Sequence, residues 1–305
     1  MHKGGSVVVL WALVCASAQV SLAENPRPRL MQEEVRISVA GGQYSIAATI
    51  LRPEGEGPYG GVVLNHGTPG SASGRARESS ELLINSAAVF ARRGYVVVLP
   101  LRRGFGATGG EFAEDPGSCA NPDYRKGEQN AADDVMAAYD YTRALPYVDG
   151  RRMILAGQSA GGIVSLVAAG TRNPEGLLAV LSFAGGRGGN PDFRPGIPCA
   201  VEPVAKLLES VGKNVRVPVL LHYAENDMYF NAQTSRLWYQ RFAAGGARTE
   251  YVLQPAFGRD GHYIFSEELG VRLWLPAVEQ FLGRHGVPFE LDPAWEKGSE
   301  QLSRR

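Results

Sequence analysis

Short apolar runs alternate with segments of helical pattern along most of the chain. The runs are rich in Val, Ile and Leu and have the length of strands that are buried on both faces of a sheet. Such alternation predicts a doubly wound α/β sheet with right-handed crossovers. The expected strands are Gly61–Asn65, Tyr95–Pro100, Met153–Ala156, Leu178–Phe183, Val217–Tyr223 and Glu250–Leu253. The helices expected between and after them are about Glu78–Arg93, Glu128–Leu145, Ala160–Thr171, Val201–Val211, Asn231–Ala244 and Glu267–His285.

Two stretches that precede the first of these runs alternate apolar and polar residues with a period of two. Glu33–Val39 and Gln43–Leu51 flank Gly41-Gly42, an arrangement that is typical of a β-hairpin. The hairpin brings the expected total to eight strands, antiparallel in the hairpin and parallel in the rest. We expect helices on both faces of this sheet.

Two other stretches, Gly104–Lys126 and Gly185–Ala200, show neither pattern. Each follows the end of an expected strand, which is where α/β folds build their sites. No linker or break in composition divides residues 24–305, so we expect one domain over that range.

The first 23 residues have the pattern of a secretory signal peptide. Lys3 precedes the apolar run Val7–Ala18, which is too short to span a bilayer, and small residues follow up to Ala23. A buried strand or a membrane anchor is the alternative. We expect cleavage after Ala23, a secreted or periplasmic protein, and no membrane span in the remainder.

Composition and charge exclude several classes of protein. The 305 residues include 31 Lys and Arg and 31 Asp and Glu, and 44% are hydrophobic, which does not fit a disordered chain. The neutral balance, with no block of like charge, argues against nucleic acid as the main partner. No P-loop, H-E-x-x-H or paired C-x-x-C motif is present, so we expect neither a metal nor a cofactor.

The segment Gly157-Gln158-Ser159-Ala160-Gly161 fits the pattern G-x-S-x-G. It lies between an expected strand and an expected helix, so it predicts a tight strand-to-helix turn that presents Ser159 as a nucleophile. The flanking glycines permit the strained backbone of such a turn. The alternative is a Gly-rich turn in which Ser159 only caps the helix.

A serine nucleophile needs a base and a group that orients the base. Among the five histidines, His262 lies in the loop after the last expected strand, the best position for a base. Asp227 follows the preceding strand, which gives the chain order Ser159, Asp227, His262 of one known triad fold. Glu225 and Asp260 are rival candidates for the acid.

An oxyanion hole needs two backbone donors. The first expected donor is the N–H of Ala160, directly after the nucleophile. The second comes from the loop after the first parallel strand, where Thr68 is the preferred residue and Gly67 the alternative. Pro69 has no N–H to donate.

Arg102, Arg103 and His66 also border the expected site, at strand ends. Arg102 and Arg103 are candidates for binding a substrate carboxylate, Arg103 above all, and His66 is a second candidate for substrate contact. The structural alternative for the arginines is a salt bridge with an acid such as Asp133 or Asp134. For His66 we expect a role in shaping its loop rather than in proton transfer.

The segment Gly104-Phe105-Gly106-Ala107-Thr108-Gly109 matches the dinucleotide-binding pattern G-x-G-x-x-G after a strand. That function needs a helix to begin at the loop, where it receives the pyrophosphate. The residues that follow, with Pro116, Gly117 and Pro122, do not favour a helix. We therefore do not expect nucleotide binding.

Cys119 and Cys199 are the two cysteines that remain after cleavage at Ala23. They lie in the two irregular stretches, which we expect over the same edge of the sheet. In an oxidising compartment this predicts a disulfide that fixes the roof of the site. Two buried free thiols are the alternative.

The chain resembles an α/β-hydrolase and is similar, within that fold, to dienelactone hydrolase-like and prolyl-oligopeptidase-like hydrolases. The resemblance implies that Ser159 is the nucleophile, His262 the base and Asp227 the orienting acid. Dienelactone hydrolase itself typically has a Cys nucleophile, so Ser159 argues against dienelactone as the substrate. The residues that carry the resemblance are His66-Gly67, Arg103-Gly104-Phe105-Gly106 with Gly109, Ser159, Asp227 and Gly261-His262.

These observations predict a serine hydrolase that cleaves a small-molecule carboxylic ester through an acyl-enzyme. A serine peptidase or amidase of the prolyl-oligopeptidase-like type is the alternative enzyme. A binding module on the same fold is the alternative without catalysis. The sequence specifies neither the acyl and alcohol groups of the substrate nor the oligomeric state.

Overall fold

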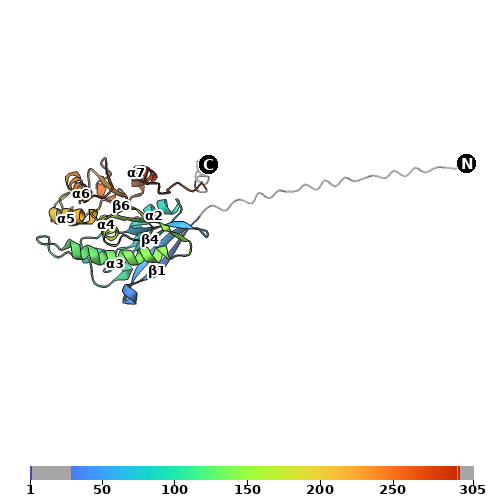
Figure 1. Ribbon diagram of the computed structural model, residues 1–305, viewed down its shortest axis with the longest axis horizontal. Helices are drawn as coiled ribbons and strands as arrows, with labels where there is room; N and C mark the ends of the chain where they lie inside the picture. The colour runs from blue at the N-terminus through green and yellow to red at the C-terminus, as the bar shows by residue number, and fades with distance from the viewer. Residues whose placement is uncertain (2–28, 294, 296–305) are drawn as a thin grey trace.

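An eight-stranded sheet forms the centre of the part of the chain that the structure describes (Figure 1). This computed structural model describes residues 1, 29–293 and 295, so the predicted signal segment lies outside the described residues apart from Met1. The strands are β1 (Leu30–Val39), β2 (Tyr44–Pro53), β3 (Tyr59–Asn65), β4 (Tyr95–Pro100), β5 (Val148–Gln158), β6 (Leu177–Phe183), β7 (Val219–Ala224) and β8 (Thr249–Gln254).

The strands lie in the order β1-β2-β4-β3-β5-β6-β7-β8. β1 and β2 form an antiparallel hairpin, and β2 also pairs antiparallel with β4. All other neighbouring strands pair in parallel. The predicted sheet, mostly parallel with an N-terminal antiparallel hairpin, is therefore confirmed. Because β3 and β5 lie side by side inside it, the loops that follow them leave the sheet together.

Helices cover both faces of the sheet, as predicted. Alternate residues of a strand point to opposite faces. In β4, Val96 and Val98 belong to one apolar cluster, whereas Val97 and Leu99 belong to another. The first cluster includes residues of α3 (Tyr124–Arg143), α4 (Ala160–Arg172), α5 (Val201–Gly212) and α6 (Ala232–Ala244), and the second includes residues of α2 (Ile84–Ala91) and α7 (Val271–Arg284).

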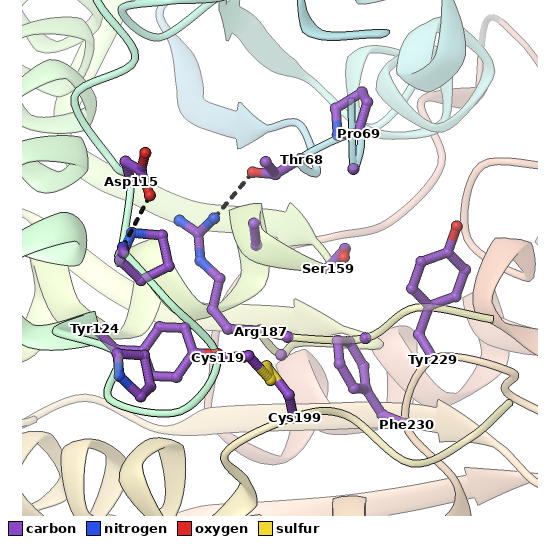
Figure 2. Close-up of a pocket in the computed structure, with 18 of the residues that line it drawn as sticks. Thr68, Pro69, Asp115, Cys119, Tyr124, Ser159, Arg187, Cys199, Tyr229 and Phe230 are labelled. Carbon is purple, nitrogen blue, oxygen red and sulfur yellow. Dashed lines mark hydrogen bonds between the residues drawn. A yellow bond between two sulfur atoms is a disulfide. The ribbon is translucent and has the colours of Figure 1, made fainter. Parts of the chain in front are cut away.

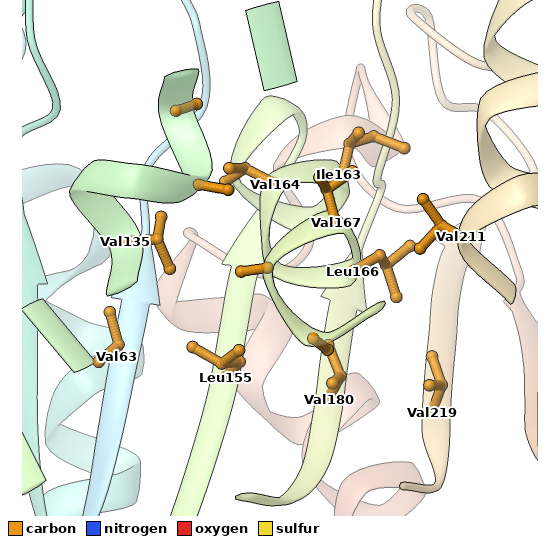
Figure 3. Packing of buried hydrophobic residues seen from close by; sticks show 14 of the residues in the cluster. Val63, Val135, Leu155, Ile163, Val164, Leu166, Val167, Val180, Val211 and Val219 are labelled. Atoms are coloured by element: carbon orange, nitrogen blue, oxygen red, sulfur yellow. The ribbon is translucent and has the colours of Figure 1, made fainter. Parts of the chain in front are cut away.

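The helix α4 packs over the middle of the sheet (Figure 3). Val164 and Val167 of α4 are fully buried in the same cluster as Leu155 of β5 and Val180 of β6. Burial of side chains this size contributes about 1.5–3 kcal/mol each. This packing fixes the position of the first turn of α4, which follows Ser159 directly.

Some element boundaries differ from those expected. The expected helix Glu78–Arg93 is divided into a 3₁₀ turn, Ser80–Leu83, and α2. α3 begins at Tyr124 because the side chain of Asp123 accepts a hydrogen bond from the N–H of Lys126 and caps the helix. The short helix α1 (Ala72–Ala76) was not predicted. In the G-x-G-x-x-G segment only a 3₁₀ turn forms, at Gly106–Thr108, and residues 109–123 contain no helix.

His222 lies in β7 and is fully buried. Its ring packs against that of Phe183, with 5.4 Å between the ring centroids. Nε2 of His222 lies 3.3 Å from Nε2 of Gln254. Burial lowers the pKa of His222 from 6.5 to about 3, so the folded protein holds this imidazole neutral.

We predict that His222 makes the protein less stable as the pH falls. Between pH 6.5 and about 3 the unfolded chain binds a proton on this imidazole that the folded chain excludes. The free energy of unfolding should therefore decrease with falling pH, by up to about 1.4 kcal/mol per pH unit for this one proton. In the variant His222→Asn this contribution should be lost. Urea denaturation of both proteins at several pH values measures the two slopes, and parallel profiles would contradict a neutral His222.

Candidate active site

Ser159 occupies the turn between β5 and α4, in which Gly157 and Gly161 have no room for a side chain. Its backbone has φ 57° and ψ −124°, a region that non-glycine residues rarely adopt. A Cβ atom added at Gly161 would lie 2.1 Å from the carbonyl oxygen of Asn65, and one added at Gly157 would lie 2.3 Å from that of Gly161. The two glycines are thus required by the close approach of β3, β5 and α4, and Ser159 stands at the N-terminus of α4 as expected for the pattern.

Ser159 lies in the wall of a pocket of about 330 Å³ (Figure 2). Four loops build the other walls, and they follow β3, β4, β6 and β7. Both irregular stretches of the sequence take part. The lining includes Thr68 and Pro69 after β3, Phe112, Asp115 and Cys119 after β4, Arg187 and Cys199 after β6, and Tyr229 and Phe230 after β7.

His262 and Asp227 face one another beside this pocket. Nδ1 of His262 lies 3.1 Å from both carboxylate oxygens of Asp227, and both side chains are buried. Oδ1 of Asp227 also accepts hydrogen bonds of 2.8 Å from the backbone N–H groups of Tyr229 and Phe230. These donors hold the carboxylate in place, so it can orient the imidazole and stabilise its protonated form.

The rival acids of the sequence analysis lie elsewhere. Oδ1 of Asp260 accepts hydrogen bonds of 2.9 Å from the backbone N–H groups of His262 and Met228. Asp260 therefore shapes the loop that carries the imidazole. Glu225 is exposed. Of the three candidates, the structure places only Asp227 against Nδ1 of His262.

The loop of His262 is fastened to the turn of Ser159 by a residue that sequence reasoning missed. The side-chain amide of Gln158 donates a hydrogen bond of 2.7 Å to the backbone carbonyl of His262. The imidazole stacks on the ring of Tyr229, with centroids 4.0 Å apart, and contacts Phe230 edge-on. Both of these rings line the pocket of Ser159. The position of Gln158 next to the nucleophile was the only sequence signal for this contact.

The two expected oxyanion donors lie on the same pocket. Ala160 is the first residue of α4, and Thr68 belongs to the loop after β3; both line the pocket with Ser159. Gly67, the alternative donor, lies against the nucleophile, because an added Cβ would be 3.2 Å from Cβ of Ser159. The turn and this loop therefore converge on one space, as an oxyanion hole requires.

His66 and Arg103 are not among the residues that line this pocket. Nδ1 of His66 lies 2.6 Å from the carbonyl of Gly67, and its Nε2 accepts a hydrogen bond from the backbone N–H of Arg102. Burial, with the nearby charge of Arg102, lowers the pKa of His66 to about 3. A neutral imidazole in these contacts shapes the loop.

Arg103 forms the salt bridge that the sequence analysis gave as its structural alternative. Its Nε lies 3.0 Å from Oδ1 of Asp134, and its backbone N–H donates a hydrogen bond of 2.8 Å to Oδ2. The guanidinium also lies over the ring of Tyr44, 4.4 Å from its centroid. Two other arginines line the pocket: Arg75 of α1, and Arg187 in a Gly-rich stretch after β6 that gave no recognised motif.

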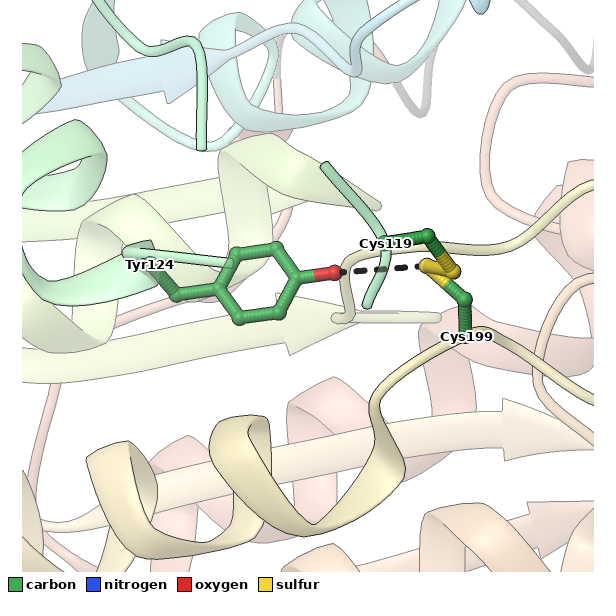
Figure 4. Close-up of a disulfide and its surroundings, with 3 residues drawn as sticks. All are labelled: Cys119, Tyr124 and Cys199. Carbon is green, nitrogen blue, oxygen red and sulfur yellow. Dashed lines mark hydrogen bonds between the residues drawn. A yellow bond between two sulfur atoms is a disulfide. The ribbon is translucent and has the colours of Figure 1, made fainter. Parts of the chain in front are cut away.

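Cys119 and Cys199 form the predicted disulfide, with 5.7 Å between their Cα atoms (Figure 4). It joins the loop after β4 to the loop after β6, and both cysteines line the pocket. The hydroxyl of Tyr124 lies 3.9 Å from Sγ of Cys199. The bridge therefore ties two walls of the pocket together.

Within the residues that the structure describes, no group of three or more His, Cys, Asp or Glu side chains is arranged to hold a metal ion. In the same part of the chain, no helix has the length and apolar character needed to cross a membrane.

Comparisons with known proteins agree with this architecture. The profile of the prolyl oligopeptidase family matches residues 83–184, a range that includes Ser159 but neither Asp227 nor His262. Among proteins of curated function, none matches the chain.

Several solved structures have the same fold at low sequence identity. They include dienelactone hydrolase from Anabaena variabilis (TM-score 0.55, 19% identity), brefeldin A esterase (0.59, 17%) and acylaminoacyl peptidase from Pyrococcus horikoshii (0.56, 17%). The alignments cover 85%, 84% and 86% of this chain and 98%, 77% and 43% of the respective structures. The expected α/β-hydrolase fold is thereby confirmed.

We predict that loss of the disulfide changes both stability and the pocket. The bridge closes a loop with a sequence separation of 80, for which the chain-entropy model gives up to about 4 kcal/mol. The double variant Cys119→Ser/Cys199→Ser should have a lower free energy of unfolding and an altered preference among esters of different acyl length, because two pocket walls are released.

Dithiothreitol provides the matched control for this prediction. It should shift the native protein towards the behaviour of the double variant and leave the double variant unchanged. Equal stability and equal substrate preference of the two proteins would show that the bridge does not hold the pocket.

Proposed function

We propose that this chain, an α/β-hydrolase by its fold, is a serine hydrolase that cleaves a small carboxylic ester. The observation that carries the proposal is the contact of His262 with Asp227 next to a pocket whose wall holds Ser159 on a strained turn. Strain at a non-glycine residue persists where the surrounding structure enforces it, and such positions cluster at functional sites.

In the proposed reaction, Oγ of Ser159 attacks the carbonyl carbon of the ester. Nε2 of His262 takes the serine proton and passes it to the departing alcohol, while Asp227 stabilises the imidazolium at Nδ1. The N–H groups of Ala160 and Thr68 hold the negative oxygen of the tetrahedral intermediate. Water then attacks the acyl-enzyme by the same route, which releases the acid and restores Ser159.

The size of the pocket favours an ester of a small molecule over a peptide. Its volume of about 330 Å³ lies at the small end of the range for ligand sites. The Cys119–Cys199 bridge restrains two of its walls.

A serine peptidase or amidase is the second candidate. The match of residues 83–184 to the prolyl oligopeptidase family favours it. The triad chemistry is common to both candidates, so the leaving group distinguishes them.

We also include export from the cytoplasm in the proposal, because disulfides persist in oxidising compartments and this chain has one between two pocket loops.

We predict that Ser159→Ala abolishes turnover of esters and leaves the fold intact. Loss of a triad nucleophile should reduce kcat by at least about 10⁴-fold. The measurement is a panel of p-nitrophenyl esters of increasing chain length, with the matching p-nitroanilides, on both proteins. Faster hydrolysis of the anilides would favour the peptidase or amidase candidate.

Covalent labelling tests whether the protein is an enzyme or a binding module. A fluorophosphonate probe should label the native protein at Ser159 and leave the variant unlabelled. Absence of labelling and of turnover in the native protein would favour a binding module instead of an enzyme.

We predict that Asp227→Asn lowers kcat by several powers of ten, whereas Asp260→Asn does not. The amide of the first variant would stabilise the wrong tautomer of His262. Asp260 is a matched control, since it is a neighbouring carboxylate that binds backbone N–H groups and does not contact the imidazole. Steady-state kinetics on an ester substrate measure both effects, and the reverse ranking would assign the acid to Asp260.

A further inference from the structure

A chain of buried ion pairs reaches the pocket wall at Arg187. Glu114, after β4, is 2% exposed, and Arg102 at the end of the same strand is fully buried. Arg187, after β6, is 6% exposed, and Glu128 of α3 is 1% exposed. Burial of four ionisable side chains is energetically expensive, and an apolar cluster of the same volume is often as stable or more stable. The cluster therefore calls for an explanation beyond stability of the fold.

Glu114 is the centre of this cluster. Its Oε1 lies 2.6 Å from Nε of Arg102, and its Oε2 lies 2.5 Å from Nη2 of Arg187. Burial alone would raise the pKa of Glu114, but the charges of the two arginines outweigh it and hold the pKa well below its usual range. The guanidinium of Arg187 is also paired with Glu128 through Nε.

The cluster contacts the loop of the expected oxyanion donor at the side chain of Thr68. Nη1 of Arg187 donates a hydrogen bond of 3.0 Å to Oγ1 of Thr68 (Figure 2). Oγ1 of Thr68 donates one of 3.2 Å to Oε2 of Glu114. The hydroxyl thus accepts from one charged group and donates to another, which fixes the side-chain rotamer of Thr68.

The other end of the same loop is held by Arg102. Its Nη1 donates a hydrogen bond of 3.0 Å to the carbonyl of His66, and its backbone N–H donates one of 3.2 Å to Nε2 of that ring. The peptide groups between His66 and Thr68 are therefore clamped on both sides by residues that bind Glu114. Donors of an oxyanion hole act only when they are held in place before the charge develops.

We propose that Glu114 is a positioning residue for the oxyanion hole, acting through Arg187, Arg102 and the hydroxyl of Thr68. Glu114 does not touch the substrate. It fixes the backbone of the loop after β3 at the distance from Ser159 that the tetrahedral intermediate requires. The inference rests on the proposed serine hydrolase function and assigns a catalytic purpose to the buried charges.

The main test removes the hydroxyl of Thr68 and keeps the backbone N–H of that residue. Thr68→Val retains the shape and the N–H of residue 68 but loses the hydroxyl that joins Arg187 and Glu114. We expect kcat on a p-nitrophenyl ester to fall with KM nearly unchanged, by no more than the roughly 10²- to 10³-fold that loss of an oxyanion-hole donor itself costs. Thr68→Ser keeps the hydroxyl and should restore most of the lost kcat.

A second readout separates positioning from general loss of structure. An aryl trifluoromethyl ketone forms a hemiketal with a reactive serine, and its negative oxygen occupies the oxyanion hole. Its affinity should fall by the same factor as kcat/KM in Thr68→Val and in Glu114→Gln. Asp134→Asn weakens a different buried ion pair, that of Arg103, and should leave both quantities unchanged.

The proposal is overturned if Thr68→Val has native kcat and native affinity for the ketone, or if only KM changes. If Glu114→Gln fails to fold, Thr68→Val and Thr68→Ser still test whether the hydroxyl of residue 68 supports catalysis. Ser159→Ala separates a failure of the proposed function from a failure of the proposed role of Glu114. If that variant is active, the proposed function is wrong; if it is inactive while Thr68→Val behaves as native, only the role of Glu114 is wrong.

Discussion

The absence of space around the turn at Ser159 is the constraint on which the rest of the site depends. Gly157 and Gly161 carry no side chain because the backbone of β3 and the start of α4 occupy the positions that Cβ atoms would take. This approach can occur only where β3 and β5 are neighbours in the sheet and α4 is packed firmly across it. The burial of α4 thus maintains the strained backbone conformation of Ser159. The local geometry of the turn and the packing of the whole sheet stabilise the same position of this residue.

Around this turn, groups from separate loops are held by polar contacts with backbone atoms. Gln158 binds the carbonyl of His262, Asp227 binds two N–H groups as well as the imidazole, and Arg102 binds the carbonyl of His66. Loops after strands lack the repeating hydrogen bonds of helices and sheets, so their backbone groups need such partners when they are buried. In this molecule the partners are side chains at or near the reacting groups. The polar contacts that complete the loops therefore also define the geometry of the site.

The sequence was sufficient to predict the fold and a contact between Asp227 and His262, because both follow from patterns that are visible over short stretches. The period of two in the hairpin, the apolar runs of the parallel strands and the glycines around Ser159 are all visible over a few residues. Asp227 and His262 could be placed by their positions after successive strands. The partners of Arg187 could not, because Thr68, Glu114 and Glu128 are between 59 and 119 residues away and nothing local marks the contact. Arg103 illustrates the same limit, since its position at a strand end fits a pocket residue and a salt bridge with Asp134 equally well.

The chain between Cys119 and Cys199 is a closed covalent ring, and it separates Ser159 from Asp227 and His262. Ser159 lies inside the ring, together with the whole of α3, β5, α4 and β6, whereas Asp227 and His262 lie in the C-terminal tail that includes β7 and β8. Beyond Cys199 itself, the tail is held to the ring by non-covalent contacts, which include the ladder between β6 and β7 and the bond from Gln158 to His262. Partial unfolding from the C-terminal side would accordingly displace His262 and Asp227 while the ring still restrained Ser159. A single cut in the peptide backbone inside the ring would release no fragment at all.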